Sequence, residues 1–365
     1  MFFETINEVK AELEKIQEDS AIQGILFFGC DKNNSKTSEL EAALASNHKP
    51  LLGGIFPEII AGGIRKDSGF IVVPLFEELE VVHFQSPENH SPIETQIENF
   101  TKNRNTEIGS VFCFLNALWS HKQSFLNALY NQVGPFVQYV GGGAGSLSFK
   151  SFPCVFCNQK VFEHAAVIGV IKKPIAIGVA HGWQPISDAI KVTEAAGNSI
   201  VSLNWKPAFE VYQAWVEEHS KLKIGSDNFF DIAKSYPLGL VRMDDEMIIR
   251  DPYAVENGML HIVDEVPENT YIRFMNGNMN SLLDGARKAM ELSSQKTQSE
   301  NTLFCIDCIS RVLYMQDNFE EELAILNQID RINGILSIGE IANAGHAALE
   351  IYNKTVVVAQ WKKTN

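Results

Sequence analysis

Residues 135–145 read PFVQYVGGGAG, an apolar run followed by four glycines within five positions. The run has the length and composition of a buried strand, and the glycines indicate a turn at its end. The same pattern occurs in KPLLGGIF (49–56) and in INGILSIGE (332–340). Because another apolar strand and a helical segment precede each of the three, the sequence predicts a repeated β-α-β-β unit.

The first strand of each unit is also visible in the sequence. GILFFGC (24–30), SVFCFLN (110–116) and TLFCIDC (302–308) are apolar runs of strand length. We therefore expect the α+β fold class, with mixed, largely antiparallel β-sheets flanked by helices. We expect two domains built from these units, residues 1–205 and residues 206–365, with an amphipathic helix at the start of the first.

Three further predictions concern individual strands. GFIVVPL (69–75) and LEVVHFQS (79–86) are predicted to form an antiparallel pair. Residues 247–275 are predicted to form three short strands, with a turn at Asn257–Gly258. LEIYNKTVVVA (349–359) is predicted to be one final strand.

The bulk composition argues against several classes of protein. The chain has 365 residues and a formal net charge of −15, whereas nucleic acids and anionic membranes attract clustered Lys and Arg. No apolar run approaches the roughly 18–20 residues of a membrane-spanning helix. Residues 1–19 lack the basic and apolar regions of a signal peptide. We therefore expect a cytoplasmic protein with neither a nucleic-acid nor a membrane partner.

The six cysteines lie mostly in apolar, strand-like segments, which suits reduced cysteines in a core. Two Cys-x-x-Cys pairs, Cys154/Cys157 and Cys305/Cys308, raise the alternative of a four-thiolate zinc site. Positions i and i+3 of a strand point to opposite faces, so extended pairs are poor zinc ligands. The sequence gives equally little support for a redox role, because neither pair lies at the start of a helix. We expect no metal site.

The glycine cluster does not match a phosphate-binding loop, which needs a helix directly after its glycines. Here SLSFKSFPCVF (146–156) follows, which is β-like, and the spacing fits neither the dinucleotide fingerprint nor the P-loop. The glycines instead permit positive φ angles and a close approach of the backbone to another group. Two main interpretations remain, a tight structural turn and a turn that lines a ligand pocket.

Polar side chains near predicted strand ends are the other candidates for ligand binding. His181 is followed by Gly182 and Trp183. Two interpretations remain for its imidazole: it binds a metal, haem or another ligand, or it is hydrogen-bonded to the backbone and packed on Trp183. Arg311 and Glu340 suit the two charges of a zwitterion such as an amino acid. They equally suit a structural ion pair with each other.

Several stretches together resemble one family, the FIST proteins, which carry an N-terminal and a C-terminal FIST domain. In chain order the stretches are GGGAGSL, VAHGWQPI, KVTEAAGNSIVSLN, PAFEVY, YPLGL, MIIRDP, LFCIDCISR, EEEL, GILSIGEI and IYNKT. The resemblance covers roughly residues 24–360. It implies a non-catalytic, ligand-sensing role in intracellular signal transduction, with an amino acid or related small molecule as the ligand proposed for such domains.

The resemblance also implies a signalling partner. In bacteria such domains are joined to, or encoded beside, histidine kinases, cyclic-dinucleotide enzymes or chemoreceptors. A subset resembling this architecture binds haem and senses nitric oxide. The chain departs from the family at Gly53-Gly54-Ile55-Phe56, where many members have a Gly-Cys-Ser-Thr-like turn. This departure removes small hydroxyl and thiol groups from the turn.

Three hypotheses for function follow. The first is a small-ligand sensor without catalytic residues, whose pocket lies between the glycine-ended strands of the two domains. The second is a haem-based nitric oxide sensor with His181 as an axial ligand. The third is a cysteine-dependent enzyme in which Arg311 activates Cys308. The residues expected to bind the ligand of the first hypothesis are Gly141, Gly142, Gly143, Gly145, His181, Trp183, Arg250, Cys308, Arg311, Gly339, Glu340, Asn353 and Thr355.

Overall fold

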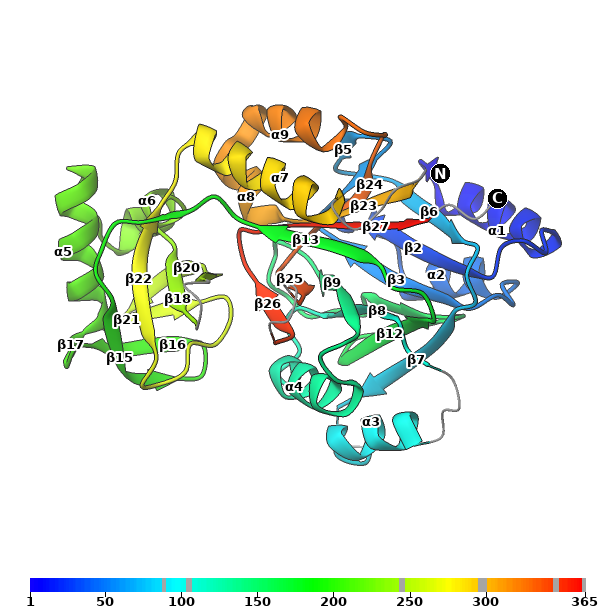
Figure 1. Cartoon of the computed structure of the whole chain (residues 1–365), viewed down its shortest axis with the longest axis horizontal. Helices are drawn as coiled ribbons and strands as arrows, with labels where there is room; N and C mark the ends of the chain where they lie inside the picture. The colour runs from blue at the N-terminus through cyan, green and yellow to red at the C-terminus, as the bar shows by residue number, and fades with distance from the viewer. Residues whose placement is uncertain (87–89, 103–106, 243–246, 295–300, 344–347, 363–365) are drawn as a thin grey trace.

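Three six-stranded sheets surround a common apolar core in the computed structural model of the protein, and a fourth sheet forms a lobe at one side (Figure 1). The structure describes residues 1–86, 90–102, 107–242, 247–294, 301–343 and 348–362. We call the three sheets and their helices the body, and residues 184–276 the lobe.

The three sheets of the body share one strand order. In each sheet an edge strand comes first, and the last strand of the repeat lies next to it. Two central parallel strands follow, and a hairpin completes the sheet. Sheet 1 consists of β1 (Phe2–Phe3), β6 (Phe70–Leu75), β2 (Gly24–Cys30), β3 (Leu51–Phe56), β10 (Val155–Cys157) and β11 (Lys160–Phe162). Sheet 2 consists of β7 (Glu80–Gln85), β12 (Ala165–Ile171), β8 (Ser110–Asn116), β9 (Gln138–Ala144), β25 (Glu340–Ala342) and β26 (Glu350–Tyr352). Sheet 3 consists of β13 (Ala176–Ala180), β27 (Val356–Lys362), β23 (Asn301–Cys308), β24 (Asn333–Ser337), β4 (Glu58–Ala61) and β5 (Ile64–Lys66).

This order divides the body into three repeats, residues 2–75, residues 80–171 and, with the lobe inserted, residues 176–362. In every repeat the hairpin leaves its own sheet and joins the sheet of another repeat. The hairpin β4–β5 of repeat 1 joins sheet 3, β10–β11 of repeat 2 joins sheet 1, and β25–β26 of repeat 3 joins sheet 2. The hairpins therefore pass around the body in a closed cycle.

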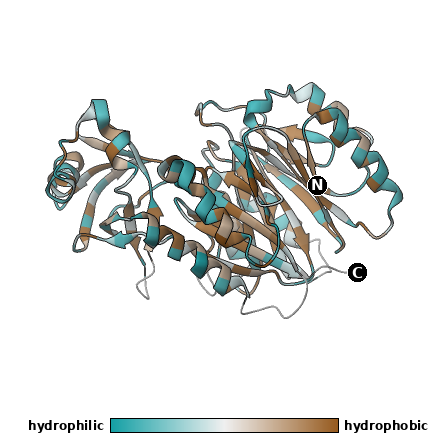
Figure 2. Ribbon diagram, turned by 90° about the horizontal axis from the view of Figure 1, so that it is seen from above, coloured by the Kyte–Doolittle hydropathy of each residue, from teal (hydrophilic) through white to brown (hydrophobic). Residues whose placement is uncertain are grey.

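Helices cover the outer faces of the sheets, with α1 and α2 on sheet 1, α3 and α4 on sheet 2, and α7 to α9 on sheet 3 (Figure 1). Their bounds are α1 (Ile6–Glu18), α2 (Thr37–Leu44), α3 (Ile93–Lys102), α4 (Lys122–Val133), α7 (Met279–Ser294), α8 (Ile309–Met315) and α9 (Phe319–Leu326). Helix α1 begins at a capping box formed by Thr5 and Glu8. Hydrophilic residues mark the outer helices and hydrophobic residues mark the strands between them (Figure 2).

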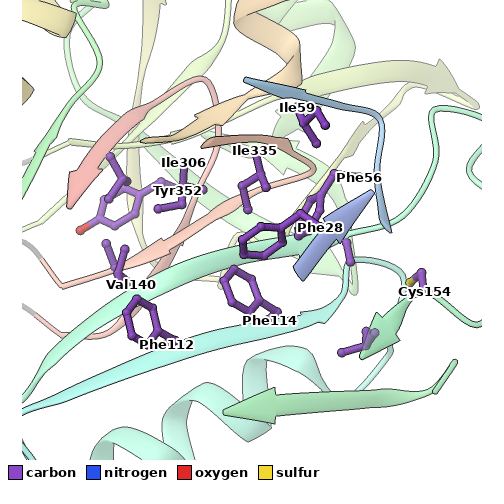
Figure 3. Packing of buried hydrophobic residues seen from close by; sticks show 14 of the residues in the cluster. Phe28, Phe56, Ile59, Phe112, Phe114, Val140, Cys154, Ile306, Ile335 and Tyr352 are labelled. Atoms are coloured by element: carbon purple, nitrogen blue, oxygen red, sulfur yellow. The ribbon is translucent and has the colours of Figure 1, made fainter. Parts of the chain in front are cut away.

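Hydrophobic side chains from all three sheets meet in the core of the body (Figure 3). The ring centroid of Phe28 in sheet 1 lies 5.0 Å from that of Phe114 in sheet 2 and 5.3 Å from that of Phe304 in sheet 3. Strands β2 and β8 are buried along their whole length, which explains why their sequences are apolar without alternation. The repeats therefore share one central core, and two further apolar clusters lie between sheets 2 and 3 and the helices that cover them.

The lobe is inserted between β13 and α7 of repeat 3. Its sheet runs β19-β18-β22-β15-β16-β21-β20, with β14 paired to β22 and β17 paired to β16. The elements of the lobe are β14 (Gln184–Pro185), β15 (Ile190–Ala196), β16 (Ser199–Leu203), β17 (Lys206–Pro207), α5 (Ala208–Ser220), α6 (Phe229–Ala233), β18 (Leu238–Val241), β19 (Met247–Arg250), β20 (Pro252–Glu256), β21 (Met259–Ile262) and β22 (Tyr271–Asn276).

The α+β fold class and the repeated β-α-β-β unit are confirmed, but three strand predictions are wrong. Residues 69–75 and 79–86 do not pair, because β6 returns beside β2 while β7 pairs with β12 in sheet 2. Residues 247–275 contain four strands, β19 to β22, instead of three. The final strand is two strands in different sheets, since Lys354 has a positive φ of 50° and interrupts it.

The expected boundary at residues 205 and 206 falls inside the lobe, between β16 and β17. Strands from both sides of this position share sheets 2 and 3. Of the helices that the structure describes, none combines the length and the apolar character needed to cross a membrane.

Candidate functional site

Gly53, Gly141 and Gly334 occupy equivalent places in the three repeats. Each lies in the second central strand of its sheet, opposite a residue of the first central strand. A Cβ atom added to these glycines would lie 1.8, 1.6 and 2.3 Å, respectively, from the carbonyl oxygen of that residue. Only glycine leaves room for this approach of the two strands, so the repeated glycines serve the packing of the body.

The other glycines of the cluster are packing residues as well. A Cβ atom on Gly142 would lie 2.9 Å from the Ser337 Cβ, and one on Gly143 would lie 2.2 Å from the Ile338 carbonyl oxygen. Gly145, directly after β9, has a φ of 150°. The close contacts of Gly141, Gly142 and Gly143 support the interpretation as structural glycines, and the ligand-binding role of the cluster stays a prediction. The group that their backbone approaches is the protein itself.

Arg311 is fully buried and all its N–H groups have partners inside the protein. Its Nε and Nη2 donate to the Glu322 carboxylate, with Nε 3.0 Å from Oε1. Its Nη1 donates to the carbonyls of His181 (2.8 Å) and Lys354 (3.4 Å), and Nη2 donates to that of Leu282 (3.1 Å). Burial alone would lower the pKa of Arg311, but the carboxylates of Glu322 and Asp307 together outweigh it and raise that pKa. The internal contacts use every donor of Arg311, so they do not support the predicted ligand contact.

Glu340 does not pair with Arg311. It accepts hydrogen bonds from the Ser337 hydroxyl (2.8 Å) and the Thr355 N–H (3.3 Å), and it lies against the Cys308 thiol. Burial raises the pKa of Glu340 and the pKa of Cys308, so both groups favour their neutral forms. A raised pKa disfavours the thiolate, which is the nucleophilic form of cysteine, so it does not support the predicted activation of Cys308.

Arg250 ties the lobe to the body. It ends β19, and its Nη1 donates to the Ile351 carbonyl of β26 at 2.8 Å. Its Nε donates to the Glu265 carbonyl at 3.1 Å. Burial lowers the pKa of Arg250, although nearby carboxylates oppose this effect. Because these contacts are internal and Arg250 is buried, they indicate a structural role, and the ligand-binding role stays a prediction. We call the contact between the lobe and residues 350–354 the seam.

Two aspartates of the lobe complete the seam. Asp251 Oδ2 lies 3.2 Å from Lys354 Nζ, and the Asp251 N–H donates to Asn353 Oδ1 at 3.3 Å. Asn353 Nδ2 donates to Asp264 Oδ2 at 2.7 Å, and Lys122 Nζ of the body lies 2.5 Å from Asp264 Oδ1. Burial opposes the ionisation of Asp264, but Lys122 outweighs it and lowers the Asp264 pKa. The seam is thus a chain of hydrogen-bonded ion pairs.

A cavity of about 250 Å³ lies at the seam, and we call it the junction cavity. Tyr253 and Val263 of the lobe face Leu313 and Ile338 of the body across it. Three of the residues predicted to bind a ligand line its wall, and these are Cys308, Gly339 and Asn353. The structure therefore brings together part of the predicted set, at a place where lobe and body meet.

Asp251 is the polar residue of the junction cavity with an open hydrogen-bonding position. Its side chain is 1% exposed, and its Oδ1 has no hydrogen-bond partner within the described part of the chain. Burial raises the pKa of Asp251, and the neighbouring Lys354 opposes the rise. A buried acceptor without a partner is costly, so its presence at a cavity wall marks a place for a donor.

A second chamber of about 310 Å³ adjoins the junction cavity. The rings of Phe149 and Tyr253 border both spaces, with centroids 6.2 Å apart and planes at 12°. The Lys122–Asp264 ion pair lies on the wall of this second chamber. The two stacked rings therefore stand between an apolar space and a more polar one.

His181, Trp183 and Thr355 line a separate cavity of about 530 Å³. His181 Nδ1 accepts the Trp183 N–H at 2.9 Å, and the ring also hydrogen-bonds the Met247 backbone. Burial and then the Arg311 charge lower the pKa of His181 to about 4. Since backbone groups already occupy the imidazole, these residues do not fit an axial haem ligand. These hydrogen bonds favour the backbone-satisfied interpretation of His181.

The cysteines do not assemble into a metal site. All six are free and buried, with Cys154 and Cys157 in or beside β10 of sheet 1 and with Cys305 and Cys308 in β23 of sheet 3. Over the described ranges, no group of three or more His, Cys, Asp and Glu residues is placed to hold a metal ion.

Sequence reasoning missed Asp251, Phe149 and Tyr253. Asp251 is adjacent to Arg250 in the stretch MIIRDP, so a charged pair at a strand end was a signal for it. No local signal connects Phe149 and Tyr253, which lie about a hundred positions apart and meet only because the lobe folds back on the body. Phe149 has a positive φ of 52°, which its sequence context does not reveal.

The protein thus consists of a body of three repeats, an inserted lobe and a cavity between the two. The sequence model of the FIST N domain matches residues 23–206, and that of the FIST C domain matches residues 208–343. The chain belongs to the FIST family, whose domains are sensory domains of signal transduction. The two matches meet inside the lobe.

The chain is also similar to an uncharacterized protein of Methanocaldococcus jannaschii. The two are 24% identical over 232 residues, which is 58% of this chain and 42% of that protein. The chain thus matches less than half the length of this curated relative.

Proposed function

We propose that the protein is a small-ligand sensor in signal transduction, and that its ligand occupies the junction cavity. The observation that carries the proposal is the position of this cavity, between the lobe and the body and next to the seam. Its volume of about 250 Å³ lies just below the range of about 300–1,000 Å³ that drug-sized ligands occupy, so the ligand is small. Its walls are mostly apolar, with a few polar groups, as small-molecule sites are.

The output of the sensor is the position of the lobe. The lobe contacts the body through the polar chain of the seam, in which Asp251 and Asp264 take part. A ligand that fills the cavity adds contacts to both sides, so it stabilises one placement of the lobe over others. A partner protein that binds the lobe or its border with the body reads this change.

The proposed partner is a signalling protein such as a histidine kinase or a cyclic-dinucleotide enzyme, as the family suggests. The proposed role is binding and not catalysis, which the raised pKa of the Cys308 thiol supports. The proposed compartment is the cytoplasm. Six free, buried cysteines support this placement, because a reducing compartment keeps thiols in that state.

A thermal-shift screen tests the proposal with amino acids, organic acids and neutral aromatic compounds. A compound at 100 times its Kd stabilises the protein by about 2.7 kcal/mol, so a binder raises the melting temperature by several degrees. The variant Leu313→Trp fills the junction cavity and should abolish the shift. Leu222→Trp, at a 57% exposed position of the lobe, is the matched control and should retain it. A shift that survives Leu313→Trp, or no shift with any compound, contradicts the proposal.

A further inference from the structure

The polar wall of the junction cavity offers an acceptor and no unpaired cation. Asp251 Oδ1 is buried and lacks a hydrogen-bond partner among the described residues. Other polar groups of the lining are bonded inside the protein. The Asn353 amide donates to Asp264 and to the Tyr352 carbonyl, and the Ser310 side chain hydrogen-bonds the Asp251 carboxylate. A ligand therefore meets one open acceptor at this wall.

The charges around that acceptor already balance. Lys354 Nζ lies 3.2 Å from Asp251 Oδ2, and Lys122 pairs with Asp264 on the wall of the neighbouring chamber. Arg311 is saturated by its internal contacts. A ligand ammonium or carboxylate would add an uncompensated charge to a desolvated site, which costs several kcal/mol. The electrostatics favour a ligand without net or local charge.

The mouth of the cavity is apolar as well as its walls. Leu147, Phe149, Phe230 and Tyr253 line the cavity and are 40, 50, 39 and 43% exposed. Large apolar side chains that gather at one exposed place mark a binding surface, whereas single exposed ones do not. The flat rings of Phe149 and Tyr253 suit contact with another flat ring.

We propose that the ligand is a small, uncharged aromatic molecule with one N–H or O–H donor, of the indole or phenol type, and that this donor bonds Asp251 Oδ1. The inference rests on the proposed function and narrows it to one class of ligand. This class of ligand differs from a zwitterion. The arginines that would bind the carboxylate of a zwitterion donate instead to groups inside the protein. The aromatic body of the ligand packs between the lobe and the body.

Isothermal titration calorimetry on the full chain tests this class with pairs of probes. Indole is compared with N-methylindole, and 4-ethylphenol with 4-ethylanisole, because each pair differs only in the donor. A hydrogen bond to a charged acceptor changes the affinity about tenfold or more, so the methylated probes should bind at least tenfold more weakly. Tryptophan and tyramine carry the charges that the site disfavours, and they should bind more weakly than indole and 4-ethylphenol.

The variant Asp251→Asn locates the acceptor. The ratio between indole and N-methylindole affinities should fall to less than about threefold, since the acceptor has lost its charge. The probe pairs on the unmodified protein keep the proposal testable if this variant does not fold. Equal binding of indole and N-methylindole, or tighter binding of tryptophan, overturns the inference and leaves the sensor function standing. An absence of binding by every screened compound overturns the sensor function itself.

Discussion

The body and the seam bury polar groups in opposite ways. Inside the body the Arg311 guanidinium is surrounded by acceptors, and the Glu322 carboxylate neutralises its charge. Along the seam the ion pairs follow one another from Lys122 to Lys354, and the chain ends with Asp251 Oδ1 open beside a cavity. The body also holds a buried acceptor without a partner among the described residues, Asp307 Oδ2, but Asp307 does not line the junction cavity and Asp251 does. An open acceptor indicates a site for a ligand where it lies at a cavity wall.

The largest loss of stability is expected from a substitution in the body. Gly141→Val places side-chain atoms where a Cβ alone would lie 1.6 Å from a backbone carbonyl oxygen. Strands β8 and β9 cannot separate without opening sheet 2, so we expect a loss above about 5 kcal/mol in the free energy of unfolding and little soluble protein. Soluble yield and urea denaturation measure the loss.

Gly225→Ala is the matched control for this substitution. An added Cβ at Gly225 meets no atom within 4 Å, and its φ of −148° is open to any residue. This variant should unfold within about 0.5 kcal/mol of the unmodified protein. If Gly141→Val were equally stable, the repeated glycines would not be packing residues.

The second effect concerns the ion pair inside the body. Arg311→Met leaves the Glu322 carboxylate buried without its partner, so we expect a loss of about 3–5 kcal/mol in the free energy of unfolding. Chemical denaturation measures it. Arg311→Met combined with Glu322→Leu removes this ion pair. Asp307, whose carboxylate lies 3.4 Å from Arg311 Nε, stays behind, but burial raises its pKa and favours its neutral form, so the double variant should recover most of the loss. A double variant no better than the single one would show that the charge pair is not the cause.

The smallest loss of stability is expected from a substitution at the seam. Asn353→Ala removes the donor to Asp264 and the acceptor of the Asp251 N–H, which together cost about 1–3 kcal/mol. Because these contacts join the lobe to the body, hydrogen exchange should rise in β19 to β21 and stay unchanged in β2 and β8. Equal changes in both regions would remove the distinction between seam and body.

The elements of the body could be predicted from the sequence, but their pairing could not. Apolar runs such as GILFFGC mark buried strands on composition alone, and glycines recur at matching places in the three repeats. The exchange of hairpins depends on contacts between distant segments, such as Gly142 with Glu340, for which no local signal exists. Adjacent strands in sequence therefore gave a wrong pairing for residues 69–75 and 79–86.

The candidate site was predictable in part for the same reason. Cys308, Gly339 and Asn353 lie at strand ends near the junction cavity, as polar residues at strand ends suggest. Whether a charged side chain faces a ligand or another residue depends on its partners, which the sequence does not give. Arg250 and Arg311 have the chemistry of ligand-binding residues, but carbonyls and carboxylates within the protein use their donors.

The closed cycle of hairpins has a consequence for synthesis and for dissection of the chain. Each repeat supplies the hairpin at the edge of a second repeat's sheet, and the hairpin at the edge of its own sheet comes from the third repeat. No repeat is therefore complete in isolation. Residues 356–362 fill the interior of sheet 3, which means that this sheet can close only after these residues have left the ribosome. Fragments cut at any repeat boundary would carry one orphaned hairpin and one bare sheet edge, the combination that favours domain-swapped assemblies.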